Sequence, residues 1–202
     1  MSVARATFSR LSPKTSALFL CDMQEKFRNN ICYFPQIVEV SRRLFEAAKI
    51  LDMKVIATEQ YPKGLGHTVP ELGLNGSSVP IIEKTKFSMC VPPVEDHLGS
   101  EIKTIILCGI ESHVCVYHTA LDLLAKGFAV HVVVDAASSR SMVDRKYAFK
   151  QMNKAGAVMT TSECVILGLV GDAAHPKFRE VQKLIIKPAP DTGLLTLEKA
   201  NL

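Results

Sequence analysis

The alternation of short β-rich runs with helical patterns constrains the fold of this chain more than any other feature. Apolar or β-branched runs predict six strands, at residues 16–21, 54–58, 80–84, 104–109, 128–135 and 157–161. Helical patterns separate most of these runs, at residues 34–51, 94–98, 115–126 and 142–155, with further helices from 162 onward and at 177–186. Strands that alternate with helices are typical of βαβ units. We therefore predict an α/β fold, a three-layer α/β/α sandwich around about six mostly parallel strands.

Length and composition predict one globular domain. The 202 residues are 48% hydrophobic and 22% charged, close to the average of globular proteins. We expect a single domain over residues 1–202, with a loose N-terminus at 1–13 and a C-terminal tail at 187–202. The formal net charge is only +4 and basic residues form no run, so we expect a small-molecule substrate and no nucleic acid as partner. No apolar stretch approaches the roughly 18 residues of a bilayer span, so we expect no membrane partner either.

The six cysteines indicate free thiols in a reducing compartment. There is no CxxC pair and no zinc-type Cys/His spacing. Cys21, Cys108 and Cys164 lie in or beside apolar runs and are predicted to be buried. The start of the chain lacks the pattern of a secretory signal, so we expect a cytoplasmic protein. Nucleus and mitochondrion stay open, because both keep thiols reduced. Residues 1–14 are also basic and contain Ser and Thr, like some mitochondrial transit peptides.

Three reactive side chains follow predicted strands. Asp22 comes directly after the first strand, Lys84 ends the third, and Cys115 follows the fourth at the start of a helix. In doubly wound, Rossmann-like sheets, ligands bind beyond the carboxyl ends of the strands. Taken alone, each residue has an ordinary structural interpretation: a loop cap, a solvated charge and a packed thiol. Their occurrence together at one sheet edge favours a catalytic site.

The three side chains supply the parts of a cysteine nucleophile. A helix N-terminus and a nearby cation both favour the thiolate, which is the reactive form of cysteine. Asp22 is placed to take the thiol proton and to return it to a leaving group. The backbone from Glu111 to Cys115 turns into a helix, and its N–H groups are candidates for stabilising an oxyanion.

Three segments resemble the signature segments of the isochorismatase-like hydrolase family, which includes nicotinamidases and N-carbamoylsarcosine amidases. The segments are LCDMQEKF at 20–27, EKTKFS at 83–88 and CGIESHVCV at 108–116, and the resemblance covers residues 14–186. It implies the triad Asp22, Lys84 and Cys115, in agreement with the strand-end argument.

The resemblance also implies several details of the site. A cis peptide is expected between Ile110 and Glu111, with the backbone N–H groups of Glu111 and Cys115 directed at the oxyanion. Gln24 and Phe27 are expected in the substrate pocket near Asp22. The loop at 59–79, and with it Glu59 and Tyr61, is expected to contribute further lining, together with a neighbouring subunit of a homo-oligomer.

Sequence differences from other members of the family indicate which cofactors and reactions to expect. Nicotinamidases hold a metal with an Asp-x-His pair and a further His after the second strand, where this chain has TEQY at 58–61, so no metal is predicted. No GxGxxG motif follows the first strand, so no nucleotide cofactor is predicted. A thiol in the third segment favours hydrolysis of a small amide-type substrate through a covalent thioester. The alternatives are an isochorismatase-type ether or ester hydrolase, or a non-catalytic interaction protein of the same fold.

Polar residues after the fifth strand are interpreted as structural. Ser138, Ser139 and Ser141 do not form a nucleophile elbow, and a helix cap explains them. Arg140, Asp144 and Arg145 are expected to form surface ion pairs.

Overall fold

The computed structural model describes residues 10–195 and contains one six-stranded, all-parallel sheet. The strands are β1 (Ser16–Cys21), β2 (Lys54–Gln60), β3 (Ile81–Lys84), β4 (Thr104–Ile110), β5 (Ala129–Ser138) and β6 (Val158–Thr160). Their order is β3-β2-β1-β4-β5-β6, which confirms the predicted α/β class. The predictions for residues 1–9 and 196–202, a loose N-terminus, a transit-like segment and the end of the tail, lie outside the described residues. The single domain over 1–202 stays a prediction.

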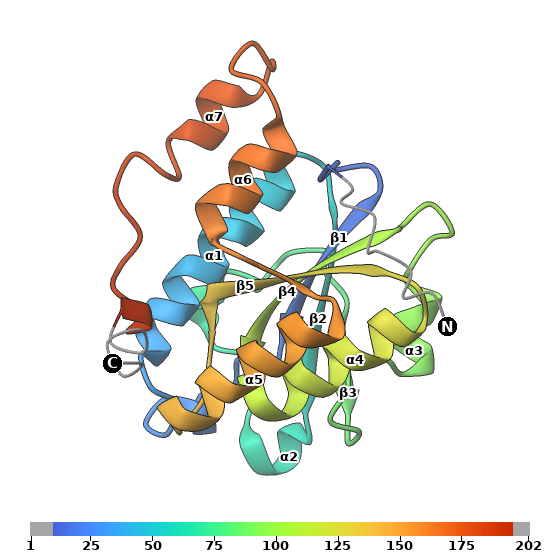
Figure 1. Cartoon of the computed structure of the whole chain (residues 1–202), viewed down its shortest axis with the longest axis vertical. Coiled ribbons are helices and arrows are strands. Elements are labelled where there is room, and N and C mark those ends of the chain that lie inside the picture. Colours follow the sequence, from blue (N-terminus) through green and yellow to red (C-terminus); the bar gives the residue numbers. More distant parts are fainter. Residues whose placement is uncertain (1–9, 196–202) are drawn as a thin grey trace.

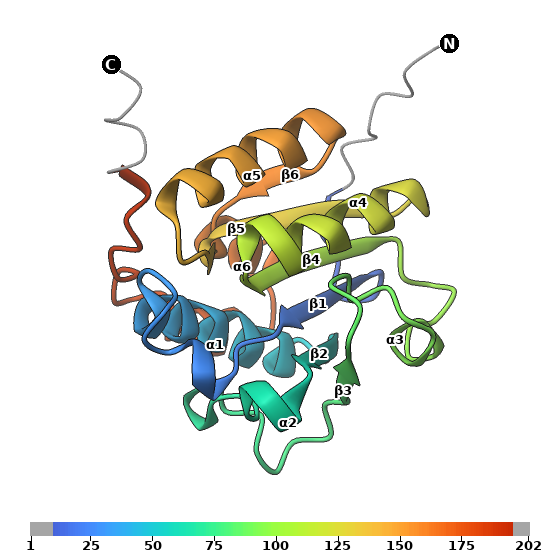
Figure 2. The same ribbon diagram turned by 90° about the horizontal axis from the view of Figure 1, so that it is seen from below.

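Helices cover both faces of the sheet, as Figures 1 and 2 show. The α-helices are α1 (Phe34–Ile50), α2 (Pro62–Leu65), α3 (Pro92–Asp96), α4 (Tyr117–Ala125), α5 (Met142–Ala155), α6 (Ser162–Val170) and α7 (Phe178–Gln182). Short 3-10 turns η1 (Glu25–Phe27) and η2 (Pro70–Leu72) and a π-helical turn η3 (Ser112–Val116) complete the elements. Helices α1, α6 and α7 lie on one face, and α3, α4 and α5 lie on the other.

Strand β1 lies at the centre of the fold and is completely buried. Leu18 and Leu20 pack into the core under α1 and α6, whereas Phe19 and Cys21 pack into the core under α4 and α5. This alternation follows from the two-residue period of a strand. Gly109 on β4 pairs with Cys21, and a Cβ on Gly109 would lie 2.2 Å from the Cys21 carbonyl oxygen. Only glycine permits this close approach of the two strand ends.

Several element boundaries differ from the sequence predictions. Strand β2 continues to Gln60, and the expected loop at 59–79 contains α2 and η2. The helix expected at 115–126 begins earlier, with the π-helical turn η3, so Cys115 lies inside that turn. The terminal helix expected at 177–186 is confined to α7. Within residues 10–195, no helix is long and apolar enough to cross a membrane.

Two burial predictions were wrong. Arg145 is fully buried and donates to the carbonyl oxygens of Thr192 (2.6 Å) and Val134 (3.0 Å), so it fastens the C-terminal segment rather than forming a surface pair. Burial lowers its pKa to about 10. Cys164 is exposed, because the core-facing positions of α6 are the next residues, Val165 and Ile166. Ser141 caps α5 by accepting the Asp144 N–H, as expected.

Candidate active site

Asp22 lies directly beyond β1 and is held by both of its carboxylate oxygens. The residue has a left-handed backbone (φ 50°) and is 1% exposed. Thr58 donates its hydroxyl proton to Oδ1 at 2.7 Å, and Lys84 Nζ donates to Oδ2 at 2.7 Å. A carboxylate that accepts on both oxygens from a hydroxyl and an ammonium is fixed in orientation.

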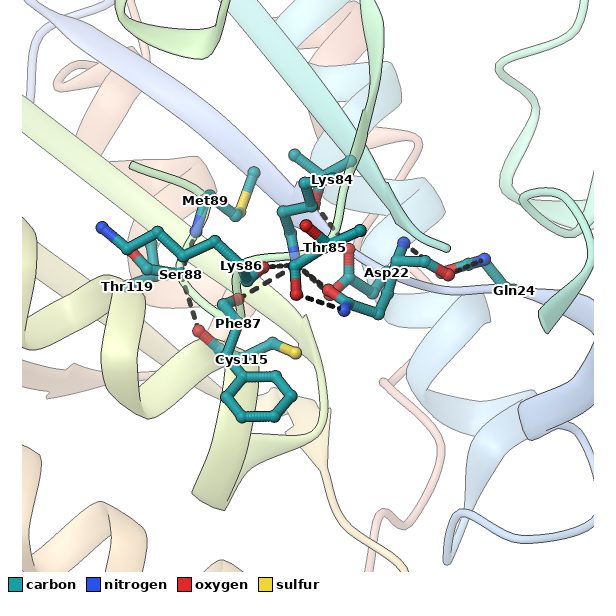
Figure 3. Close-up of polar contacts among 12 residues, drawn as sticks. Asp22, Gln24, Lys84, Thr85, Lys86, Phe87, Ser88, Met89, Cys115 and Thr119 are labelled. Carbon is teal, nitrogen blue, oxygen red and sulfur yellow. Dashed lines mark hydrogen bonds and ion pairs between the residues drawn. The ribbon is translucent and has the colours of Figure 1, made fainter. Parts of the chain in front are cut away.

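Lys84 ends β3 and directs its ammonium group inward to Asp22. Nζ also donates to Gln60 Oε1 (2.8 Å) and to the carbonyl oxygens of Phe87 (3.0 Å) and Lys86 (3.2 Å). Figure 3 shows this ammonium group among its acceptors. Burial opposes the charged form, but electrostatic interactions with the Cys21 thiol, the Asp22 carboxylate and the Cys115 thiol outweigh it and raise the pKa of Lys84. The lysine is therefore a permanent cation at neutral pH.

Cys115 lies in η3 and is 7% exposed. Its carbonyl oxygen accepts the Thr119 hydroxyl at 2.6 Å, and Thr119 in turn accepts the Met89 N–H at 2.8 Å. These bonds fasten the turn η3 to the segment after β3. Figure 3 shows the Cys115 sulfur on the side of its residue that faces Lys84 and Asp22. Burial, a hydrogen bond with Cys115 and the Asp22 carboxylate raise the pKa of Cys21 well above its ordinary value. Cys21 is therefore a protonated thiol beside Cys115.

Asp22 and Cys115 face a common cavity of about 410 Å³, a size suited to a small organic ligand, which Lys84 does not line. Its lining includes Asp22 and Cys115, and the remaining lining residues are Phe27, Gln60, Tyr61, Gly64, Leu65, Phe87, Ile110, Glu111 and Val114. The peptide between Ile110 and Glu111 is cis, at the position that the resemblance implied. Tyr61 and Phe87 are half-exposed, so aromatic side chains form the rim.

Phe27 and Tyr61 line the cavity, but Gln24 and Glu59 do not, in contrast to the sequence expectation. Gln24 is buried and bonds to the backbone of Gln60 through both ends of its amide. Glu59 is buried as well and accepts the backbone N–H and hydroxyl protons of Thr68 at 2.6 and 2.8 Å. Both side chains hold the loop that carries Tyr61, and they shape the cavity from outside.

The attachment of this loop is expected to depend on pH through Glu59 and His67. Burial tends to raise the pKa of Glu59, but the hydrogen bonds from Thr68 and His67 outweigh it and lower the pKa. The stabilisation of the loop attachment by Glu59 is therefore fully present above the ordinary pKa of Glu59, and it is lost as pH falls through the lowered pKa. The hydrogen bond with Glu59 raises the pKa of His67. The stabilisation by His67 is therefore fully present below its ordinary pKa, and it is lost as pH rises through the raised pKa.

Hydrogen exchange of the Thr68 amide measures this attachment. We expect its protection, corrected for intrinsic exchange, to decrease as the solution becomes acidic enough to protonate Glu59. The Gly66 amide is the internal reference, because it donates to the Pro62 carbonyl. Glu59→Gln is expected to remove the acid dependence. Equal acid sensitivity of the Thr68 amide in wild type and Glu59→Gln would contradict the assignment.

Three uncharged residues that sequence reasoning did not single out complete the site. Thr58 orients Asp22, Gln60 accepts from Lys84, and Thr119 fastens the Cys115 turn. Within residues 10–195, no group of three or more His, Cys, Asp or Glu side chains has a metal-binding arrangement. The absence of a metal and of a cofactor stays a prediction.

The fold, the strand-end location of the site and the sequence match together define the class. Residues 16–164 match the isochorismatase domain model, and the chain belongs to the isochorismatase family. It is 58% identical over 190 residues to isochorismatase domain-containing protein 2 of Xenopus laevis, which covers 93% of this chain and 92% of that protein. The family, with its hydrolase fold, is thus the one that the three sequence segments indicated.

Solved structures show the same fold. A MAR1 ribonuclease structure from Caenorhabditis elegans has a TM-score of 0.89 and 62% sequence identity, and covers 92% of this chain and 97% of its own. The Escherichia coli YcaC protein, described as an octameric hydrolase of unknown specificity, has a TM-score of 0.80 and 24% identity, with 96% and 98% of the two chains covered. At that identity, YcaC supports the shared fold alone.

Proposed function

We propose that the protein is a cysteine-dependent hydrolase of a small amide-type substrate, with Cys115 as nucleophile. The observation that carries this proposal is the buried Lys84–Asp22 pair at 2.7 Å, whose Asp22 lines the same cavity as Cys115. A fixed cation and a fixed carboxylate beside a thiol are the groups that nucleophilic acyl chemistry needs.

In the first half of the reaction, Asp22 takes the proton of the Cys115 thiol and the thiolate attacks the substrate carbonyl carbon. The N–H groups of Glu111 and Cys115 are the proposed donors to the resulting oxyanion. Asp22 then returns its proton to the amide nitrogen, the C–N bond breaks, and the amine leaves a thioester on Cys115. Lys84 keeps its proton throughout, because its raised pKa holds it charged.

In the second half, a water molecule replaces the amine. Asp22 removes one proton from this water, the oxygen attacks the thioester carbonyl, and the proton passes to the departing sulfur. The products are a carboxylic acid and the free thiol, so one water is consumed for each amide bond. Thr58 keeps Asp22 in one orientation for both proton transfers.

The reactivity of each cysteine toward iodoacetamide, followed against pH by peptide mass spectrometry, tests this proposal without a substrate. We expect Cys115 to be labelled faster than Cys164 at neutral pH even though Cys115 is buried and Cys164 exposed. Asp22→Asn is expected to change the pH profile of Cys115 and to leave that of Cys164 unchanged. Labelling of Cys115 at or below the rate of Cys164 would overturn the thiol mechanism.

A ribonuclease activity is the second candidate, because the C. elegans relative is described as a MAR1 ribonuclease. This description stands against the sequence prediction that nucleic acid is not a partner. The same protein sample should therefore be assayed on single-stranded RNA and on small primary amides. Cleavage of RNA that persists in Cys115→Ala would favour the second candidate, whereas amide hydrolysis that disappears in Cys115→Ala supports the first.

The remaining expectations stay predictions. The isochorismatase-type ether or ester hydrolase and the non-catalytic interaction protein are the outcomes left if Cys115 has ordinary reactivity. The homo-oligomer and the cytoplasmic location stay predictions as well.

A further inference from the structure

A second hollow of about 390 Å³ adjoins the active-site cavity. Phe27 and Glu111 line both hollows, so the two share a wall. The residues that belong to the second hollow alone are Asn29, Asn30 and Arg140. The active-site cavity has aromatic and aliphatic walls around its reactive groups, whereas the second hollow is lined mainly by hydrogen-bonding side chains. A substrate anchored at Cys115 has room to extend a polar end into it.

The two chain segments around the second hollow are fastened to each other. The Cys32 N–H donates to the Ser139 carbonyl oxygen at 3.1 Å, and the Cys32 thiol donates to the Arg140 carbonyl oxygen at 3.2 Å. Ser138 donates its hydroxyl proton back to the Cys32 carbonyl oxygen at 2.7 Å. The backbone that carries Arg140 is therefore tied to the segment that follows Asn30. Such bonds preorganise the hollow, which reduces the entropy cost of binding a ligand.

The charges of the second hollow are distributed unevenly. The Glu111 side chain is 13% exposed and lies at the shared wall. Its carboxylate accepts the backbone N–H of Arg140 at 3.3 Å. The Arg140 side chain is 67% exposed, and its Nε lies 3.8 Å from Glu111 Oε2, beyond hydrogen-bond distance. An exposed ion pair of this geometry is weak, so the guanidinium fork keeps donors for another acceptor. The Glu111 carboxylate thus lies between the two hollows, and a cation with two amides lines the second hollow alone.

We propose that the substrate carries a carboxylate, and that Arg140 binds this carboxylate with Asn29 and Asn30 as neutral donors. The inference rests on the proposed amide hydrolysis and names its substrate class, a small amide with an acidic group away from the scissile bond. Guanidinium and carboxylate match in a two-point hydrogen bond.

A third hollow, which shares Tyr61 with the active-site cavity, offers a competing location for the carboxylate. It measures about 470 Å³ and is lined by Lys63, Lys84 and Lys86 together with Glu83. Two of its cations are already paired, Lys84 with Asp22 at 2.7 Å and Lys86 with Asp122 at 2.8 Å. Lys63 lies in the same lining as the carboxylate of Glu83 and is the matched control position for Arg140.

Paired alkylating probes test the inference without a known substrate. N-iodoacetyl amino acids of increasing methylene length are compared with their carboxamides, which have the same shape and no charge. The labelling rate at Cys115 is divided by the rate at Cys164 in the same chain, and the acid-to-carboxamide ratio is taken for each length. We expect this ratio to exceed one at the length that reaches Arg140, and to fall about tenfold in Arg140→Gln. Lys63→Gln is expected to leave the ratio unchanged.

The outcomes separate this inference from the proposed function. A ratio that is the same in wild type and Arg140→Gln, while Cys115 still labels faster than Cys164, overturns only the carboxylate site. A ratio lost in Lys63→Gln also overturns it, because the anion then occupies the third hollow. Ordinary reactivity of Cys115 toward every probe overturns the proposed function itself. The rate of the carboxamide probe in Arg140→Gln shows that the variant keeps an intact nucleophile.

Discussion

Lys84→Met is expected to destabilise the protein by about 3–5 kcal/mol, because it leaves the Asp22 carboxylate buried without its cation. Both side chains of the pair are only 1% exposed, so water cannot replace the lost ammonium. Gln60 and the carbonyl oxygens of Lys86 and Phe87 lose their donor as well. Urea unfolding followed by circular dichroism measures the loss.

Lys86→Met is the matched control, because Lys86 pairs with Asp122 in a bridge whose side chains are 55% and 39% exposed. Exposed pairs are worth less than about 1 kcal/mol, so this variant should unfold close to wild type. The double variant Lys84→Met/Asp22→Asn removes the orphaned charge and should recover part of the stability. Equal stabilities of Lys84→Met and Lys86→Met would show that the buried pair does not support the fold.

Cys115→Ala is expected to reduce amide hydrolysis on the order of 10⁴-fold or more, once a substrate has been identified. The covalent intermediate cannot form without the sulfur, and Asp22 has no nucleophile to deprotonate other than water. The stability of the protein should change little, because the substitution removes a single heavy atom from a partly open cavity wall. Single-turnover kinetics, with mass spectrometry of the acylated protein, measures both the rate and the intermediate.

Cys164→Ser is the control for this experiment, because Cys164 is exposed on α6, away from the residues of the cavity. It should keep full activity and an acyl adduct. Cys115→Ser separates loss of the nucleophile from loss of side-chain packing, since a hydroxyl fills the same space but is a far weaker nucleophile at neutral pH. Undiminished hydrolysis by Cys115→Ala would exclude a thioester intermediate. It would favour a mechanism without the thiol, as in the ether- or ester-hydrolase alternative.

The order of the elements and the main catalytic candidates could be predicted from the sequence. Strand β1 and helix α5 begin and end at the predicted residues, because a wholly buried apolar strand and a helix capped by Ser141 and Gly156 have clear local signals. Asp22, Lys84 and Cys115 were found because charge or a thiol at a strand end is unusual enough to stand out. That they act together as a catalytic triad stays a proposal.

The residues that were missed depend on strand register, which one sequence does not contain. Thr58 reaches Asp22 because it pairs with Cys21 across β1 and β2, and Gln60 reaches Lys84 because the two pair across β2 and β3. Neither side chain has a charge that would draw attention to it. The burial of Arg145 was missed for a similar reason, since its acceptor Thr192 belongs to a segment without regular structure.

The wide spacing of the proposed triad along the chain has a consequence for its biosynthesis. Asp22 follows β1, Lys84 ends β3 and Cys115 follows β4 in the order β3-β2-β1-β4, and the Lys84–Asp22 bond alone joins residues 62 positions apart. Contacts of such long range form only when most of a chain has already folded. In a nascent or partly folded chain, Cys115 therefore lacks the two partners proposed for it. Under the proposed mechanism, the reactive thiol appears together with the finished sheet, which limits stray reactions of Cys115 while the protein is being made.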